Sequence, residues 1–254
     1  MSKPCCPFNA EQDPLSPTPD KAAILPLPQP ITWPRMVVRS LIGLAVVVSF
    51  LLLLRYDTNL MAWRYNLLPE GPEGLFKQVS EGFRDFAQTV PITVALIIVA
   101  TCDTRRWTII AMVLSALLLS SIGYNTGKGT IARYRPYAAK EKIGDFSTMT
   151  SEQTWLGWRP GNHDNDYRSF PSGHSAAAFA FAVTLGWFYP RLRWLFLTLA
   201  FGCALSRYVD AVHWLSDCLA GATIGYLSGW LALRPYAWLL PLQWCRPRAK
   251  KCCE

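Results

Sequence analysis

Long apolar segments separated by short polar stretches make up most of this chain. Six of them can be marked, at residues 38–54, 86–102, 107–123, 173–189, 194–206 and 214–233. Most approach the ~20 apolar residues that a helix needs to cross a bilayer, although the second contains Pro91 and the fifth is short. Six such segments leave too little polar surface to coat a soluble helical core. The pattern therefore predicts an all-α integral membrane bundle of six transmembrane helices.

A different pattern fills the interval between the first two apolar segments. Residues 59–68 look amphipathic, and after the EGPEG turn apolar residues recur at helical spacing with charged residues between them: Leu75, Val79, Phe83, Phe86 and Val90. This predicts an amphipathic helical segment that lies on the bilayer or packs on the bundle. A lipid-facing gate near a functional site is the alternative.

The two ends of the chain differ from the middle. Residues 1–34 hold nine of the nineteen prolines, which excludes regular helix or sheet there. We therefore predict a disordered Pro-rich tail over 1–34, a six-span domain over 35–236 and a basic tail over 237–254. Arg and Lys gather in DTRR at 103–106, in PRLR at 190–193 and in the C-terminal tail. Positive loops mark the cytoplasmic side, so both termini are predicted to be cytoplasmic.

Charge and cysteine usage agree with a membrane protein. The net charge of +8 favours anionic partners, and no polar basic domain is present to bind nucleic acid. None of the eight cysteines lies in the long outward loops 55–85 and 124–172, so no disulfide framework is implied. No ligand spacing recurs along the chain, and we assign no metal and no cofactor.

The first polar cluster is KGTIARYRP, which leaves the third apolar segment. If this stretch is helical, Lys128 and Arg135 share one face, Arg133 points elsewhere and Pro136 ends the element. Two cations on one face suit an anion with several oxygens, and arginine can grip two oxygens at once. Snorkelling toward lipid phosphate is the alternative.

The second cluster is FPSGHSAAAF, residues 170–179. Pro171 and Gly173 shape a tight turn, and Ser172 can cap the helix that starts there. Free backbone N–H groups at a helix start bind anions well. His174 lies in that first turn, beside any bound phosphate, although a histidine in this position can also be purely structural.

The third cluster is SRYVDAVHWLSD, residues 206–217, between two strongly apolar stretches. His213 and Asp217 are four residues apart and are therefore neighbours on a helix surface. A carboxylate that accepts the Nδ1–H would fix one tautomer and leave the Nε2 lone pair free to attack. Arg207 can add charge to the anion site, and Asp210 either pairs with it or faces water. A buried polar cluster that pins two helices together is the alternative.

With six crossings, all three clusters open on the outer face. Lys128-x6-Arg135-Pro136, Pro171-Ser172-Gly173-His174 and Ser206-Arg207-x5-His213-x3-Asp217 together resemble the three-part signature of the type 2 phosphatidic acid phosphatase superfamily, which is itself similar to the vanadium haloperoxidases. Every signature position is filled. The resemblance covers roughly residues 90–233, while the N-terminal tail and the 137–170 loop lie outside its motifs.

The resemblance implies a membrane phosphatase that hydrolyses a lipid phosphate or diphosphate through a phosphohistidine, without a metal ion. Its site would face outward, toward the periplasm if the membrane is a bacterial inner membrane. His213 would attack phosphorus, His174 would protonate the leaving oxygen and then activate water, and Asp217 would orient His213. Phosphate would be bound by five further residues: Lys128, Arg135, Ser172, Gly173 and Arg207.

Other activities remain open at this point. Phosphoryl transfer to an acceptor lipid uses the same histidine chemistry and is the alternative reaction. A transporter would place charges at the midplane of the membrane and show inverted repeats, and neither is evident. The vanadate-dependent haloperoxidases are soluble, and a non-catalytic binder would not need both histidines and the aspartate. The motifs recognise only the phosphoryl group, so the particular lipid is not specified.

Overall fold

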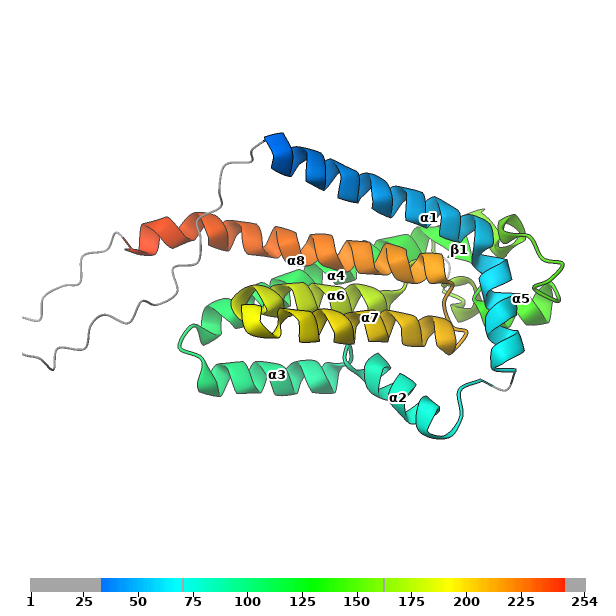
Figure 1. Ribbon diagram of the computed structural model, residues 1–254, viewed down its shortest axis with the longest axis horizontal. Coiled ribbons are helices and arrows are strands. Elements are labelled where there is room, and N and C mark those ends of the chain that lie inside the picture. Colours follow the sequence, from blue (N-terminus) through cyan, green and yellow to red (C-terminus); the bar gives the residue numbers. More distant parts are fainter. Residues whose placement is uncertain (1–32, 70, 162, 245–254) are drawn as a thin grey trace, which may run out of the picture.

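The protein is a bundle of long helices with a small irregular lobe at one end (Figure 1). The computed structural model describes residues 33–244 except 70 and 162, so most of the two predicted tails lies outside the described residues. The elements in chain order are α1 (Trp33–Leu67), α2 (Gly74–Asp85), α3 (Thr89–Cys102), α4 (Arg106–Thr130), β1 (Ile131–Arg133), α5 (Pro136–Lys142), η1 (Ser151–Thr154), β2 (Trp155–Trp158), η2 (Asn165–Tyr167), α6 (Gly173–Phe188), η3 (Pro190–Leu192), α7 (Arg193–Val209) and α8 (Leu215–Trp244).

Each of the six apolar segments forms a helix, as predicted, in α1, α3, α4, α6, α7 and α8. Three stretches are long and apolar enough to cross a membrane by themselves: Val37–Leu67, Arg106–Thr130 and Pro190–Val209. A fourth is added if α2 and α3, which are bent by 56° at a short break, count as one span. These helices expose large apolar side chains, for example Leu41 and Leu51, as lipid-facing helices do. The chain is therefore an integral membrane protein.

Helix α6 occupies the centre of the bundle and packs against α4, α7 and α8. Ten of its sixteen residues are buried, many of them alanines. The small side chains allow α8 to approach closely: a Cβ at Gly221 or Gly225 would overlap the carbonyl oxygen of Ser172 or of Ala176. Small residues at helix contacts are the usual means by which membrane helices pack, because lipid tails supply no hydrophobic driving force between helices.

Helix α1 lies at the edge of the bundle and changes direction along its length. Its first turns, blue in Figure 1, expose most of their apolar side chains, while its last turns, cyan, lie across one end of the bundle. The last turns are fixed there by buried polar residues, since Asp57 is 1% exposed and Arg64 donates from Nε to the Val209 carbonyl at 2.7 Å. The edge helix is thus attached to the bundle chiefly at the end that carries the lobe.

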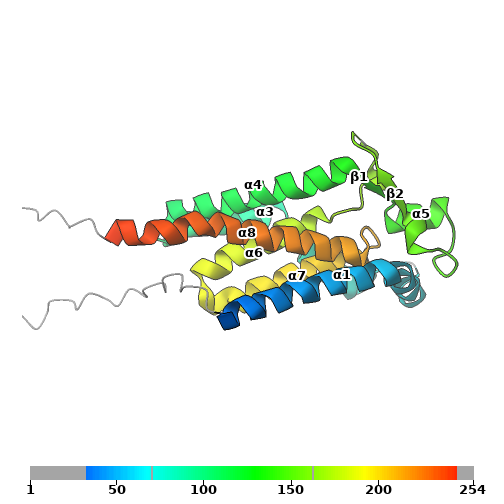
Figure 2. The same ribbon diagram turned by 90° about the horizontal axis from the view of Figure 1, so that it is seen from above.

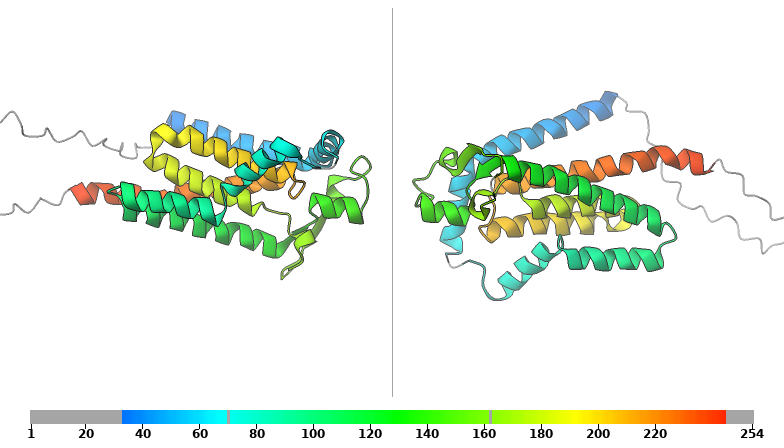
Figure 3. Two further views of the ribbon diagram at one scale, coloured as in Figure 1. Left: turned by 90° about the horizontal axis from the view of Figure 1, so that it is seen from below. Right: turned by 180° about the vertical axis from the view of Figure 1, so that it is seen from behind.

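The lobe consists of residues 131–172, and we call it the end lobe. Figure 2 and both views in Figure 3 show it, in green, beyond the ends of the long helices. It contains a two-stranded antiparallel sheet in which Ile131 of β1 pairs with Trp158 of β2, so the all-α prediction is corrected here. The helix α4 gives way to β1 at a β-branched pair, Thr130 and Ile131, which favour the extended backbone.

The loops fall into two groups at opposite ends of the bundle. The basic loops 103–106 and 190–193 lie at the same end as the start of α1 and the end of α8 (Figure 1). The turn between α7 and α8 and the end lobe lie at the other end. The start and the end of the helical domain therefore share one side, and the three polar clusters share the other.

Candidate active site

The three polar clusters meet where four helices begin or end. Lys128 is in the last turn of α4, His174 is in the first turn of α6, Arg207 is in the last turn of α7, and Asp217 is in the first turn of α8. His213 lies in the turn that joins α7 to α8. Both imidazoles interact electrostatically with Lys128 and with Arg135, so all three motifs contribute to one cation-rich site.

Lys128 and Arg135 reach this site by a different route from the one predicted. They do not lie on one helical face, because α4 ends at Thr130 and β1 separates the two residues. Pro136 does not end an element but begins α5, with Arg135 extended at the N-cap. A residue before proline is restricted to extended backbone, and proline is well suited to the first helical position, so the local sequence explains this turn.

The second motif links the other two through the backbone. Ser172 is the N-cap of α6, as predicted, and its hydroxyl accepts from the Ser175 N–H at 3.5 Å. Its own backbone N–H donates to the carbonyl oxygen of Asp217 at 3.0 Å. Gly173 faces the ring of Tyr124, where a Cβ would sit only 3.1 Å from a ring carbon. The start of α6 is therefore held directly against the start of α8.

Two arginines in the site carry N–H groups for which no described residue provides a hydrogen-bond acceptor. Arg207 is 8% exposed, and its Nη1 pairs with Asp210 at 3.2 Å, which answers the open question about Asp210. The buried Nε–H of Arg207 and that of Arg135 have no hydrogen-bond partner among the described residues. Unpaired buried donors are costly, so these two groups indicate a position for a bound anion.

His213 is 2% exposed, and its buried Nδ1 lies 3.9 Å from Oδ2 of Asp217, which is beyond a hydrogen bond. Burial, together with the nearby charges of Lys128 and Arg135, lowers the pKa of His213 to about 4. The imidazole is therefore neutral at physiological pH and keeps a lone pair.

Asp217 is held by more groups than His213 alone. Oδ2 accepts from the Ser169 hydroxyl at 2.5 Å and from the Trp214 N–H at 3.1 Å, and Oδ1 accepts from Arg133 at 2.5 Å. The carboxylate is fully buried, so these bonds keep it ionised and fixed in orientation. The position of Asp217 is therefore set by residues other than His213.

Arg133 was not predicted to matter, yet it is at the centre of this network. It is 0% exposed, and its guanidinium bridges Asp217 and Asp57 of α1, with Nη2 to Asp57 at 2.8 Å. It also lies between the rings of Trp155 and Trp214, at 4.3 and 5.1 Å from the ring centroids. The prediction placed Arg133 away from the site because it assumed a helix. The acidic partner of Arg133 could have been suspected from the sequence, because Asp57 is a lone carboxylate just after an apolar segment.

Arg168 is a second residue that sequence analysis missed, because it lies outside all three motifs. It is half-buried beside β1, and its charge interacts with those of Lys128 and Arg135. Four cationic side chains therefore gather here: Lys128, Arg135, Arg168 and Arg207. Like charges at close range repel one another, so the arrangement is suited to a small multiply charged oxyanion.

Comparison with known proteins establishes the family of the chain. The sequence profile of the PAP2 superfamily matches residues 107–240, which is more than half of the chain and includes every residue of the three motifs. The chain belongs to this superfamily.

Several curated relatives and solved structures are similar to the chain. It is 39% identical over 66 residues to the bacitracin transport permease protein BcrC of Bacillus licheniformis, covering 26% of this chain and 32% of that protein. It is 28% identical over 123 residues to the lipid A 1-phosphatase of Rhizobium etli, covering 48% of this chain and 47% of that protein. The crystal structure of Aquifex aeolicus LpxE has a similar fold, with a TM-score of 0.50 at 20% identity over 69% of this chain and 93% of that one. The matched segments thus span half or less of these curated relatives.

Proposed function

We propose that the protein is a membrane phosphatase that hydrolyses a lipid phosphate through a phosphohistidine on His213. The observation that carries this proposal is the pair of unpartnered buried donors on Arg135 and Arg207 beside a buried neutral histidine. A tetrahedral phosphoryl group offers several oxygens to such donors, and phosphoryl transfer needs mainly positioning and charge stabilisation. Membership of the PAP2 superfamily and the relatives named lipid A 1-phosphatase support the same class of substrate.

In the proposed reaction, the neutral imidazole of His213 attacks phosphorus in line, and Asp217 stabilises the positive charge that the ring acquires. His174, on the opposite side of the phosphorus, protonates the leaving oxygen. The same residue then activates a water molecule that releases phosphate from His213. Asp217 is fixed by Arg133 and Ser169 before substrate binds, so little reorganisation accompanies the attack.

Five groups bind the phosphoryl oxygens in this proposal: Lys128, Arg135, Arg207, the Ser172 hydroxyl and the Gly173 N–H. Cations occupy the positions around the phosphate where a metal-dependent phosphatase carries carboxylate ligands, and they would repel a divalent cation. We therefore propose that these side chains provide the charge stabilisation and that the reaction proceeds without a metal ion.

We further propose six membrane crossings, with both termini cytoplasmic and the site on the outer face, toward the periplasm in a bacterial inner membrane. The basic loops at 103–106 and 190–193 lie at the end opposite the site, which supports this orientation. α2 then lies near the outer surface, and the exposed apolar side chains Leu75, Phe76 and Val79 would face lipid.

The histidines give the first test. His213→Ala should reduce phosphate release from a short-chain phosphatidic acid by more than about 10³-fold, because the variant lacks the proposed nucleophile. His174→Ala should slow release of phosphate from His213, so that protein-bound ³²P accumulates as an acid-labile, alkali-stable adduct. Both are measured on full-length protein purified in detergent.

His163→Ala is the matched control, because this third histidine is exposed in the end lobe and should leave the rate unchanged. Wild-type turnover in His213→Ala would refute the assignment of the nucleophile. Loss of activity in excess chelator, restored by Mg²⁺, would refute the metal-free reaction.

A further inference from the structure

The turn that carries His213 begins with a strained residue. Helix α7 ends two residues before Ala211, which has a φ of 53°, in the left-handed region. The Ala211 N–H donates to the Tyr208 carbonyl at 2.9 Å, and the N–H groups of Val212 and His213 both donate to the Arg207 carbonyl at 3.2 Å. This pattern is a Schellman motif, in which glycine is the usual left-handed residue. Alanine is disfavoured there, so surrounding contacts must hold the turn in this shape.

Arg64 of α1 completes the cap at the end of α7. The last four carbonyl groups of a helix have no partner within that helix. In α7, the carbonyls of Ser206, Arg207 and Tyr208 accept N–H groups from the turn. The fourth, that of Val209, accepts from Arg64 Nε at 2.7 Å and also from Nη2. Arg64 is only 4% exposed, so a buried side chain from another helix satisfies the last carbonyl of α7.

Asp57 provides the matching cap at the start of α8. The N–H of Ser216, in the first turn of α8, donates to Oδ1 of Asp57 at 3.2 Å, and the Ser216 hydroxyl donates to Oδ2. Between the two caps, the Tyr208 hydroxyl donates to the Leu60 carbonyl at 2.6 Å. The carboxylate lies at the positive end of α8 and Arg64 at the negative end of α7, which suits both helix dipoles. Helix α1 therefore holds both helix ends that flank the turn.

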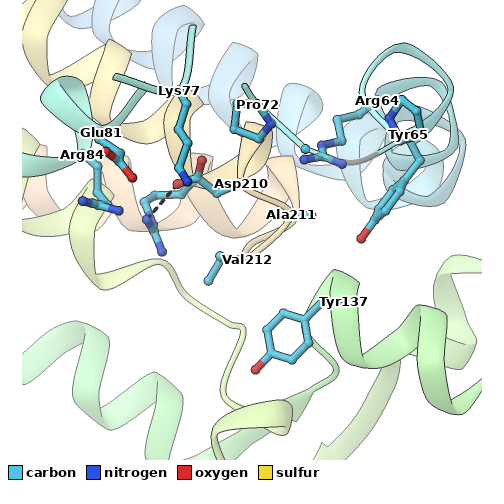
Figure 4. A pocket seen from close by; sticks show the side chains of 13 residues that line it. Arg64, Tyr65, Pro72, Lys77, Glu81, Arg84, Tyr137, Asp210, Ala211 and Val212 are labelled. Atoms are coloured by element: carbon cyan, nitrogen blue, oxygen red, sulfur yellow. Dashed lines mark hydrogen bonds and ion pairs between the residues drawn. The ribbon is translucent and has the colours of Figure 1, made fainter. Parts of the chain in front are cut away.

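Arg64 also lines a cavity, between the end of α1, α2 and the turn after α7, that has a volume of about 490 Å³. Figure 4 shows Arg64 extending from α1 toward the turn at Ala211. Direct binding of substrate is the alternative role for a cation in this position. However, each of its three guanidinium nitrogens already donates to a backbone carbonyl, two to Val209 and Nη1 to Leu68 at 3.0 Å. Arg207, which lines the same cavity, instead keeps a buried Nε–H without a partner among the described residues.

We propose that Arg64 is a positioning residue, which holds the turn after α7 in the conformation that directs His213 toward phosphorus. The inference rests on the proposed function, since it takes His213 as the nucleophile. Arg64 acts through the Val209 carbonyl, four residues before His213, and does not contact the substrate. Loss of Arg64 leaves this carbonyl without its partner and allows the turn to leave the conformation that Ala211 disfavours. Helix α1 lies outside residues 107–240, which match the superfamily profile, so this contribution is separate from the three motifs.

The first test separates turnover from substrate binding, with dioctanoyl phosphatidic acid and full-length protein that elutes as a folded species in detergent. Arg64→Gln should lower kcat by about 10–100-fold and change KM by less than about twofold, because the cations that bind phosphate stay in place. Arg64→Lys keeps one donor for the Val209 carbonyl and should lose only about two- to fivefold. Arg55→Gln is the matched control, because this exposed arginine of the same helix does not line the cavity, and it should change neither constant.

A second substitution tests whether Arg64 acts through the turn. Glycine adopts a positive φ without a steric penalty, so Ala211→Gly in the Arg64→Gln background should raise kcat at least about threefold. Glycine restores no charge, so this recovery cannot come from a contact with substrate. A rise in KM with unchanged kcat in Arg64→Gln would make Arg64 a substrate-binding residue and overturn the proposal. An unchanged kcat, an equal loss in Arg55→Gln, or no recovery with Ala211→Gly would also overturn it.

Hydrogen–deuterium exchange tests the role of Arg64 without reference to catalysis. Peptides that contain the N–H groups of Val212 and His213 should exchange at least about tenfold faster in Arg64→Gln than in wild-type protein or Arg55→Gln. If wild-type protein does not hydrolyse the lipid, the proposed function fails, and exchange alone decides whether Arg64 holds the turn. Equal exchange in the three proteins overturns the inference.

Discussion

Arg133 links three parts of the chain that are distant in sequence. Its guanidinium joins Asp57 of α1 to Asp217 of α8, and it also donates to Ser216 at 2.7 Å. A buried ion network is worth little net stability compared with apolar packing, but removal of one member leaves a buried charge without its partner. The network therefore fixes where Asp217 points.

Arg133→Gln should reduce kcat for lipid phosphate hydrolysis by about 10–100-fold with little change in KM, because Asp217 loses its fixed orientation while the phosphate-binding cations remain. Asp57→Asn should have a smaller effect in the same direction. Arg159→Gln, an exposed arginine of the end lobe, serves as the control. A rise in KM with unchanged kcat would instead make Arg133 a substrate-binding residue.

The lowered pKa of His213 leads to a separate prediction about how folding stability depends on pH. Its pKa in the folded protein, about 4, is below the value of 6.5 for an unperturbed histidine. Between these values the unfolded chain binds a proton that the folded protein does not. Folding stability is therefore unaffected by this group above pH 6.5 and falls as the pH drops toward 4, by ~3 kcal/mol in total.

This loss should appear as a steeper fall in melting temperature between pH 6.5 and pH 4 in wild-type protein than in His213→Gln, which lacks the titrating group. The measurement is thermal unfolding in detergent over this pH range. Parallel pH profiles for the two proteins would show that burial of His213 does not depress its pKa.

At the scale of elements, the contact between α6 and α8 positions the second and third motifs. The two helices approach so closely that Gly221 and Gly225 leave no space for a Cβ. The same contact places the Ser172 N–H against the Asp217 carbonyl at the active-site end. Helix separation along the bundle therefore controls the geometry of the site.

Gly225→Ala should destabilise the protein by ~1–3 kcal/mol, because the new methyl group meets the backbone of Ala176 and the helices must separate. A lower melting temperature and reduced activity in detergent are the expected results. Gly43→Ala in α1 is the control, since nothing lies within 4 Å of its added Cβ. Equal melting temperatures for the two variants would contradict the role assigned to this contact.

Across the whole molecule, the distribution of charge distinguishes the two ends of the bundle. Basic loops lie at one end, and the site with its end lobe lies at the other. Positive loops resist translocation across a membrane, which is the physical basis for placing them in the cytoplasm. The orientation can be tested without any reference to activity.

In a cysteine-free background, Glu152→Cys in the end lobe should react with a membrane-impermeant maleimide added to intact cells. Arg191→Cys, in the loop between α6 and α7, should react only after the membrane is permeabilised. Both positions are exposed, so accessibility of the side chain is matched. Labelling of Arg191→Cys in intact cells would reverse the proposed topology.

Sequence patterns were enough to predict the helices and to propose the residues of the candidate site. Apolar segments of sufficient length predict helices because backbone groups in lipid must be satisfied within the helix. The three motifs predicted His174, His213 and Asp217 as site residues, and the chemistry of these side chains predicted a bound phosphate. Ser172 was correctly predicted as a helix cap, because short polar side chains favour that position.

The contacts that connect α1 and the end lobe to Asp217 depend on the three-dimensional arrangement of the helices. Arg133 and Asp57 are 76 residues apart, and their pairing depends on where α1 crosses the end of the bundle. The sequence analysis assumed that the helix continues through Arg135, whereas α4 ends at Thr130, so it misplaced Arg133 and Arg135. The cavity between α1, α2 and the α7–α8 turn also exists only in three dimensions, because its lining residues come from segments that no local periodicity connects.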